Sequence, residues 1–113
     1  MIITVTLIKL RSVWYYFKLT MFAFKIVKQL KSEKGFIEMK NTGFGYDHYT
    51  LSVWQTTEDL KRFSRSGAHA EAMKHTKQIA TEVKTYTYSS ENIPNWKEVK
   101  KLLAGNAKVL NFK

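Results

Sequence analysis

The residues best placed to do chemistry lie on one face of a helix predicted over residues 68–81. His69, Met73 and Thr76 are spaced at i, i+4 and i+7, so a regular helix places them side by side. Apolar residues continue this face, and His69 therefore stands at the edge of an apolar stripe. A histidine beside an apolar cavity can ligate haem iron or act as an acid or base. The alternative is a structural histidine near the start of a helix.

Aromatic residues suggest what such a cavity would hold. Trp14 and Phe17 lie on the first predicted helix, and Trp54 ends a predicted strand. Together with His69 and Met73 they are candidates to line an apolar pocket for a small molecule. Packing of these aromatic residues into an ordinary hydrophobic core is the alternative.

The composition excludes several other kinds of site. The chain has no cysteine, which rules out disulfides, thiolate metal sites, iron–sulfur clusters and a cysteine nucleophile. Its three histidines are scattered and form no metal-binding pattern. The Gly43-Phe44-Gly45 segment is better explained as a hairpin turn than as a phosphate loop. We therefore expect no metal, unless His69 ligates haem iron.

The first half of the chain predicts a strand, a helix and a hairpin. Residues 2–10 alternate between apolar and hydroxyl side chains, as in a half-buried strand. Residues 13–31 carry apolar side chains at helical spacing and precede Gly35, a typical helix stop. Strands over 36–41 and 48–55 are joined by a turn and form the hairpin.

The second half predicts two helical segments and another strand. Thr56 and Asp59 resemble a capping box that begins a helix, and Gly67 bends the chain into the next one. A fourth strand over 82–88 follows. The element order is β-α-β-β-α-β, which is the ferredoxin-like, split βαβ order of an α+β fold with a four-stranded antiparallel sheet.

The length indicates one domain with an extension. At 113 residues the chain is short enough for a single core, which we place in residues 1–90. Residues 91–113 form the C-terminal extension. Asn95 and Glu98 resemble a second capping pair, and they predict a short helix over 96–104 that is followed by an extended segment.

The charge of the chain is compatible with an anionic partner but does not require one. A net charge of +10 suits a nucleic acid, an anionic membrane surface or an acidic ligand. The alternative is a solvated surface rich in lysine, because the lysines are spread over every element. Arginine, which phosphate readers prefer, appears only three times, so nucleic acid is the less favoured partner.

Two segments bear on location. The aromatic-rich segment 13–30 is interrupted by Lys18, Lys25 and Lys28, so its apolar run is too short to span a bilayer. Residues 1–10 show neither a basic start nor a small-residue cleavage site of a secretory signal. We therefore expect a cytoplasmic protein without a membrane span.

A four-stranded sheet with both helices on one face leaves its other face open. We expect Leu51 and Val53 to face the helices, because they share the apolar side of their strand. An exposed tryptophan on the opposite face is unfavourable in a monomer, and pairing two sheets would cover it. This pattern favours a homodimer. The residues expected on the open face are Thr4, Thr6, Thr50, Ser52 and Trp54, with Phe36 as a further candidate.

Two motifs resemble a known superfamily. Thr50-Leu51-Ser52-Val53-Trp54, and Ser66-Gly67-Ala68-His69 followed by Met73, are similar to the dimeric α+β barrels. These include antibiotic-biosynthesis and haem-degrading monooxygenases, and the motifs in particular resemble small bacterial relatives of spheroidene monooxygenase. The resemblance covers roughly residues 1–90. It implies a dimeric barrel with a ligand cleft between helices and sheet.

The resemblance to the haem-degrading enzymes is incomplete at their site residues. Those enzymes use an asparagine on the first strand, a tryptophan after the third strand and a histidine on the second long helix. Trp54 matches the tryptophan, Met73 stands near the histidine position with His69 one turn earlier, and the first strand has no asparagine.

Two main functions follow from the resemblance. The first is a monooxygenase-like protein that binds an apolar or aromatic ligand, with haem or without any cofactor. The second is a non-catalytic dimer that binds or senses a small ligand on the same scaffold.

Overall fold

Five strands form one antiparallel sheet in the order β2-β3-β1-β4-β5. The computed structural model describes residues 1–112, so Lys113, the end of the predicted extension, lies outside the described residues. The order of the first four strands is the split βαβ order, and the predicted fold class is confirmed. The strands are β1 (Ile2–Leu10), β2 (Phe36–Phe44), β3 (Asp47–Trp54), β4 (Ala80–Ser89) and β5 (Lys108–Asn111).

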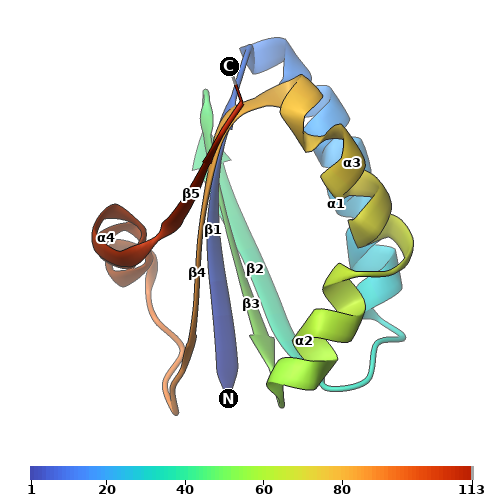
Figure 1. Ribbon diagram of the computed structural model, residues 1–113, viewed down its shortest axis with the longest axis vertical. Helices are drawn as coiled ribbons and strands as arrows, with labels where there is room; N and C mark the ends of the chain where they lie inside the picture. Colours follow the sequence, from blue (N-terminus) through green and yellow to red (C-terminus); the bar gives the residue numbers. More distant parts are fainter. Residues whose placement is uncertain (113) are drawn as a thin grey trace.

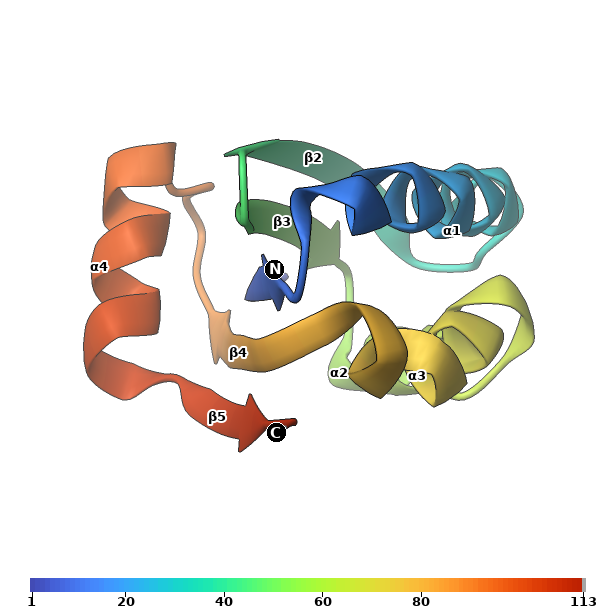
Figure 2. The same cartoon turned by 90° about the horizontal axis from the view of Figure 1, so that it is seen from above.

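Helices cover both faces of this sheet. A 3-10 turn, η1 (Val13–Tyr15), leads into α1 (Tyr16–Leu30), which lies beside α3 (Gly67–Ile79). These helices and α2 (Thr57–Ser64) lie on one face, while α4 (Trp96–Asn106) lies on the other (Figure 1, Figure 2). The sheet is therefore the middle of three layers.

Side chains cap two of the helices, as the sequence predicts. Thr56 Oγ1 accepts the backbone N–H of Asp59 at 3.1 Å and begins α2. Asn95 Oδ1 accepts the backbone N–H of Glu98 at 2.9 Å and begins α4. The predicted end of α4 was two residues early. Gly105 does not adopt a positive φ, and α4 continues to the point where the chain becomes extended before β5.

The two faces of the sheet are the reverse of our expectation, and the prediction that Leu51 and Val53 face the first two helices was wrong. Both pack against α4, on the opposite face. The reason is that Val99 and Leu103, four residues apart, give α4 an apolar stripe that matches the apolar face of the sheet. This buried cluster comprises Ile3, Val5, Leu7, Leu51, Val53, Val99 and Leu103.

The hydroxyl-bearing face, which the sequence places in the open, lies instead beneath α1, α2 and α3. Trp54 is fully buried on this side, in a cluster with Leu30 of α1 and Phe63 of α2. Neither face of the sheet is therefore bare at its centre. The homodimer stays a prediction, and the surface first suggested for it is occupied within the chain.

No helix within residues 1–112 is both long and apolar enough to cross a membrane.

Candidate ligand cavity

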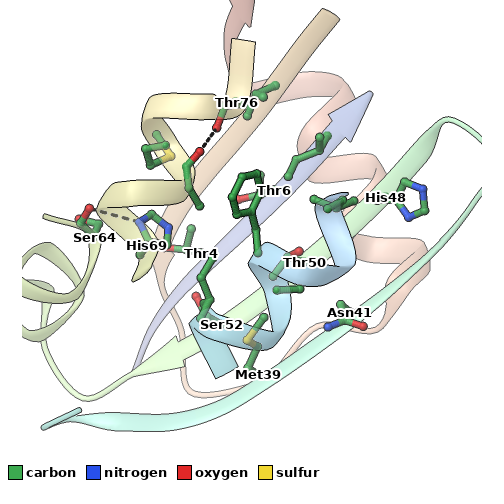
Figure 3. A pocket seen from close by; sticks show the side chains of 18 of the residues that line it. Thr4, Thr6, Met39, Asn41, His48, Thr50, Ser52, Ser64, His69 and Thr76 are labelled. Carbon is green, nitrogen blue, oxygen red and sulfur yellow. Dashed lines mark hydrogen bonds between the residues drawn. The ribbon is translucent and has the colours of Figure 1, made fainter. Parts of the chain in front are cut away.

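A large cavity lies between the hydroxyl-bearing face of the sheet and helices α1, α2 and α3 (Figure 3). Its volume is about 1260 Å³. Ligand pockets of proteins usually measure roughly 300–1,000 Å³, so this cavity has room for a molecule of several fused rings.

Hydroxyl groups form the floor of the cavity. Strand register explains this, because threonine recurs at every second position and pairs across strands: Thr4 lies opposite Thr87 on β4, and Thr6 opposite Thr50 on β3. The hydroxyl groups of Thr4 and Thr87 are hydrogen-bonded at 2.9 Å. We call this set the hydroxyl floor; it comprises Thr4, Thr6, Thr50, Ser52, Thr85 and Thr87.

The helices give the cavity an apolar roof. Residues of α1 and α3 that point toward the sheet line it, together with Phe63 of α2. The cavity is therefore amphipathic, with an apolar roof facing a floor of neutral hydrogen-bonding groups. The roof residues on the two long helices include Leu19, Phe22, Ala23, Ile26, Ala72 and Met73.

His69 lies at one end of the cavity, in the first turn of α3 (Figure 3). Its Nδ1 lies 3.2 Å from the backbone carbonyl oxygen of Ser64. A carbonyl only accepts, so Nδ1 carries the proton and Nε2 is left as an acceptor. Burial lowers the pKa of His69, and the bond to Ser64 offsets this only in part. A neutral imidazole therefore borders the cavity.

Two neighbours hold His69 in place. The backbone N–H of His69 donates to Oε1 of Gln29 on α1 at 3.1 Å. Its ring packs against Phe63, with 4.9 Å between the ring centroids, and Phe63 in turn packs against Trp54 at 5.0 Å. The position of the imidazole is thus fixed by α1, α2 and β3 together.

The charged groups around the cavity have one sign. Lys28 of α1, Lys31 at the C-cap of α1 and Lys61 of α2 are exposed residues on its lining. No aspartate or glutamate is among the described residues that line it. The potential at its edge therefore favours a ligand with an anionic substituent.

The structure brings together two of the five predicted pocket residues, His69 and Met73. Trp54 lies on the same side of the sheet but is not part of the lining; it packs against Phe63, and its Nε1–H donates to the hydroxyl of Ser52 at 3.1 Å. Trp14 and Phe17 are exposed by 77% and 70% and do not line the cavity.

The sequence pattern placed Thr4, Thr6, Thr50 and Ser52 on one face, but it did not predict that this face is the floor of a cavity, and the role of Gln29 was not predicted. The recurrence of threonine at alternate positions in two strands was a usable signal for the floor. A second histidine, His48, lines the other end of the cavity, where its ring stacks on Tyr16 (Figure 3). In the part of the chain that the structure describes, no cluster of three or more histidine, aspartate or glutamate side chains could hold a metal ion.

Comparison with known proteins identifies the fold through structure alone, since no family model and no curated protein matches the sequence. Rv0793 from Mycobacterium tuberculosis matches with a TM-score of 0.73 at 9% identity, over 83% of this chain and 98% of that one. A Deinococcus radiodurans protein, proposed to be an antibiotic biosynthesis monooxygenase, matches at 0.72 and 14% identity, over 84% and 97%.

A third solved structure has an activity in its name. SnoaB, a cofactor-independent oxygenase from Streptomyces nogalater, matches with a TM-score of 0.66 at 10% identity, over 81% of this chain and 94% of that one. At identities this low, the TM-scores establish a shared fold only. Any activity must be argued from the residues of the cavity. The chain shares the α+β fold of these three solved structures.

Proposed function

We propose that this protein binds an apolar, aromatic molecule with an acidic hydroxyl group in its cavity and promotes the reaction of that molecule with oxygen. The observation that carries the proposal is the neutral His69 imidazole at the end of an amphipathic cavity. The monooxygenase-like fold supports the choice of reaction class.

The cavity is suited to orient such a ligand. Its rings would pack against the apolar roof, and its polar substituents would hydrogen-bond to the hydroxyl floor. The lysines on the lining would stabilise a phenolate or carboxylate. No carboxylate of the lining would repel either group.

His69 is the candidate general base. Nε2 is an acceptor, and the lowered pKa keeps the imidazole neutral at physiological pH. Removal of a proton from a phenol or enol raises the electron density of its ring system. An electron-rich ligand of this kind can react with oxygen directly, so the proposal requires no further cofactor.

Binding of two related probes tests the role of the acidic proton. We expect 1-naphthol to bind more tightly than 1-methoxynaphthalene, which has the same rings and no proton to give. His69→Phe should remove this preference and retain binding of the ether, because the ring volume is kept. Equal affinities for both probes in the wild type would contradict the assignment of His69.

Turnover separates an enzyme from a binding protein. An oxygen electrode should record uptake with 1-naphthol that depends on His69. Tight binding without oxygen uptake would favour the second function, a dimer or monomer that senses a small aromatic ligand. The control is His75→Phe, since His75 lies on α3 outside the cavity lining.

Haem is a second candidate ligand, favoured by the acceptor nitrogen of His69. Imidazole nitrogen is a common axial ligand of haem iron, and the thioether of Met73 lines the same cavity. Lys28 and Lys31 would pair with the propionates, and bound haem would supply oxygen activation. A saturable Soret shift on titration with haemin, lost in His69→Ala, would establish haem binding through His69. An unchanged spectrum would leave the cofactor-free proposal.

A further inference from the structure

The outer side of η1 and α1 carries large apolar side chains that the rest of the described chain leaves exposed. Trp14, Phe17 and Phe24 are exposed by 77%, 70% and 78%. Positions 17, 21 and 24 follow i, i+4 and i+7 spacing, so they form one line along the helix. α1 belongs to the outermost layer of the fold (Figure 1, Figure 2). We call this line the outer stripe; it comprises Trp14, Phe17, Met21, Phe24 and Val27.

Lysines accompany the outer stripe without acidic partners. Lys18 and Lys25 lie to one side of it, and Lys28 continues its line at position i+11 from Phe17. The sequence of α1 contains no aspartate or glutamate. Within residues 1–112 none of these lysines takes part in an ion pair.

We propose that the outer stripe is a docking surface for an anionic phospholipid bilayer, with α1 lying parallel to the membrane plane. Exposed aromatic side chains flanked by lysine are the features by which an amphipathic helix binds in the interface region of a bilayer. The aromatic side chains enter the boundary between headgroups and acyl chains. The lysines meet the phosphate groups, and the net charge of +10 adds attraction over a longer range.

A second copy of the chain is a poorer occupant of this surface. A two-fold contact between outer stripes would bring the lysines of both α1 helices together, and α1 offers no carboxylate to neutralise them. Two chains with a net charge of +10 also repel each other on approach. An anionic bilayer would instead neutralise the positive charge of the α1 lysines.

The outer stripe is continuous with the cavity. Phe24, Val27 and Lys28 belong both to the exposed side of α1 and to the cavity lining. Docking would therefore hold one edge of the cavity against the bilayer. If the cavity binds the apolar ligand proposed above, the bilayer is the source of that ligand; docking itself does not depend on this.

Vesicle binding tests the proposal. The intact protein should sediment with vesicles of equimolar phosphatidylcholine and phosphatidylglycerol, and much less with vesicles of phosphatidylcholine alone. Added salt should weaken this binding because it screens the lysines. The fluorescence of Trp14 should shift to shorter wavelength on binding. Trp14→Phe should still sediment but lose most of this shift, because Trp54 is fully buried from the outset and Trp96 lies on α4, on the opposite face of the sheet.

Paired variants locate the surface. Phe17→Ser with Phe24→Ser should lower partitioning at least about tenfold, since two large apolar groups no longer enter the interface. Lys25→Glu with Lys28→Glu should weaken binding to the anionic vesicles. The matched control is Lys97→Glu with Lys101→Glu on α4, which changes the net charge equally on the opposite face of the sheet and should keep most of the binding.

Three results would overturn the proposal. The first is no sedimentation of the wild type with anionic vesicles. The second is an equal loss of binding in the α1 and α4 charge variants, which would show a general charge effect. The third is a concentration-dependent dimer, lost in Phe17→Ser with Phe24→Ser and accompanied by no vesicle binding, which would give the surface to a second copy. Thermal unfolding of each variant checks that these exposed substitutions leave the fold intact.

Discussion

Gln29 of α1 caps helix α3 by accepting the backbone N–H of His69 on its Oε1 at 3.1 Å. Ser66, the N-cap residue of α3, makes no capping bond of its own with its side chain. The first N–H groups of a helix have no partners within the helix, and here a side chain from another helix satisfies one of them. Gln29 also donates from Nε2 to the carbonyl of Ser66 at 3.1 Å, and so binds both ends of this turn.

Gln29→Leu should destabilise the protein by about 1–3 kcal/mol, because partly buried backbone groups of the first turn of α3 lose their partners. Urea unfolding measures this free energy. Naphthol binding should weaken as well, since His69 lies in the turn that Gln29 holds. The control is Gln78→Leu, an exposed position of α3, which should change neither quantity. Equal effects at both positions would argue against a specific cap.

The stability of the protein should depend on pH through His69. Burial lowers the pKa of His69 in the folded state below the ordinary 6.5 of the unfolded chain. Between these two values the unfolded state binds more protons, so the free energy of unfolding rises with pH. The contribution of the neutral His69 to the free energy of unfolding is complete above the pKa of this group in the unfolded chain. It is lost as the pH falls toward the lower pKa of His69 in the folded state.

His69→Gln should therefore flatten the pH profile. Urea unfolding of the wild type and the variant at several values between about pH 5 and pH 7.5 measures the difference in slope. Gln78→Asn, an exposed change on α3 that neither adds nor removes a titratable group, should leave the slope as it is. A wild type that gains stability on acidification over this range would contradict the proposed burial of a neutral ring.

Leu51 and Leu103 should be energetically coupled across the sheet–helix contact. Leu51→Ala should cost about 2–4 kcal/mol, the usual loss for a large-to-small change in a core. Because both leucines belong to the cluster beneath α4, the double variant with Leu103→Ala should cost less than the sum of the two singles. Phe22→Ala, in a separate cluster under α1, should add to Leu51→Ala without coupling. Coupling to Phe22 in place of Leu103 would restore our original assignment of the sheet faces.

Removal of α4 and β5 should make the protein self-associate. A chain that ends at Ser90 would expose the apolar face around Val5 and Leu51. In the intact chain the exposed fractions of these two side chains are 0% and 1%. Uncovered apolar patches of this kind drive association. Light scattering at micromolar concentration should show a dimer or larger species for the truncated chain. A truncated chain that stays monomeric and folded would mean that α4 contributes little to covering the sheet.

The sequence was sufficient to predict the order of the elements and the alternation of side chains along the strands. It was not sufficient to predict which face of the sheet each helix covers. Alternation along residues 2–10 separates apolar from hydroxyl side chains without saying which side meets which helix. Local patterns therefore predicted which side chains share a face of the sheet, but not which helices pack on that face. Which face each helix covers depends on tertiary packing. The apolar stripe of α4 around Val99 covers the apolar face of the sheet, and local patterns in the strands do not contain this information.

The candidate site was predictable in the same partial way. His69 was identified from its position beside an apolar stripe, and the structure places it on the cavity lining. Trp54 shares the parity of Ser52, yet its large ring at the strand end turns into the cluster with Phe63 rather than into the cavity. Gln29 could not be singled out, because a capping bond between residues 40 positions apart leaves no local signal.

The position of α4 over the apolar face has a consequence for how the folded state responds to dilution. A sheet covered by a separate subunit loses its cover as the protein concentration falls, so its stability is a function of that concentration. Here the cover is tethered to β4 by a short connection, and its effective concentration is fixed by the chain. The cover of this face is accordingly not lost on dilution, and a single chain carries it at the lowest concentrations.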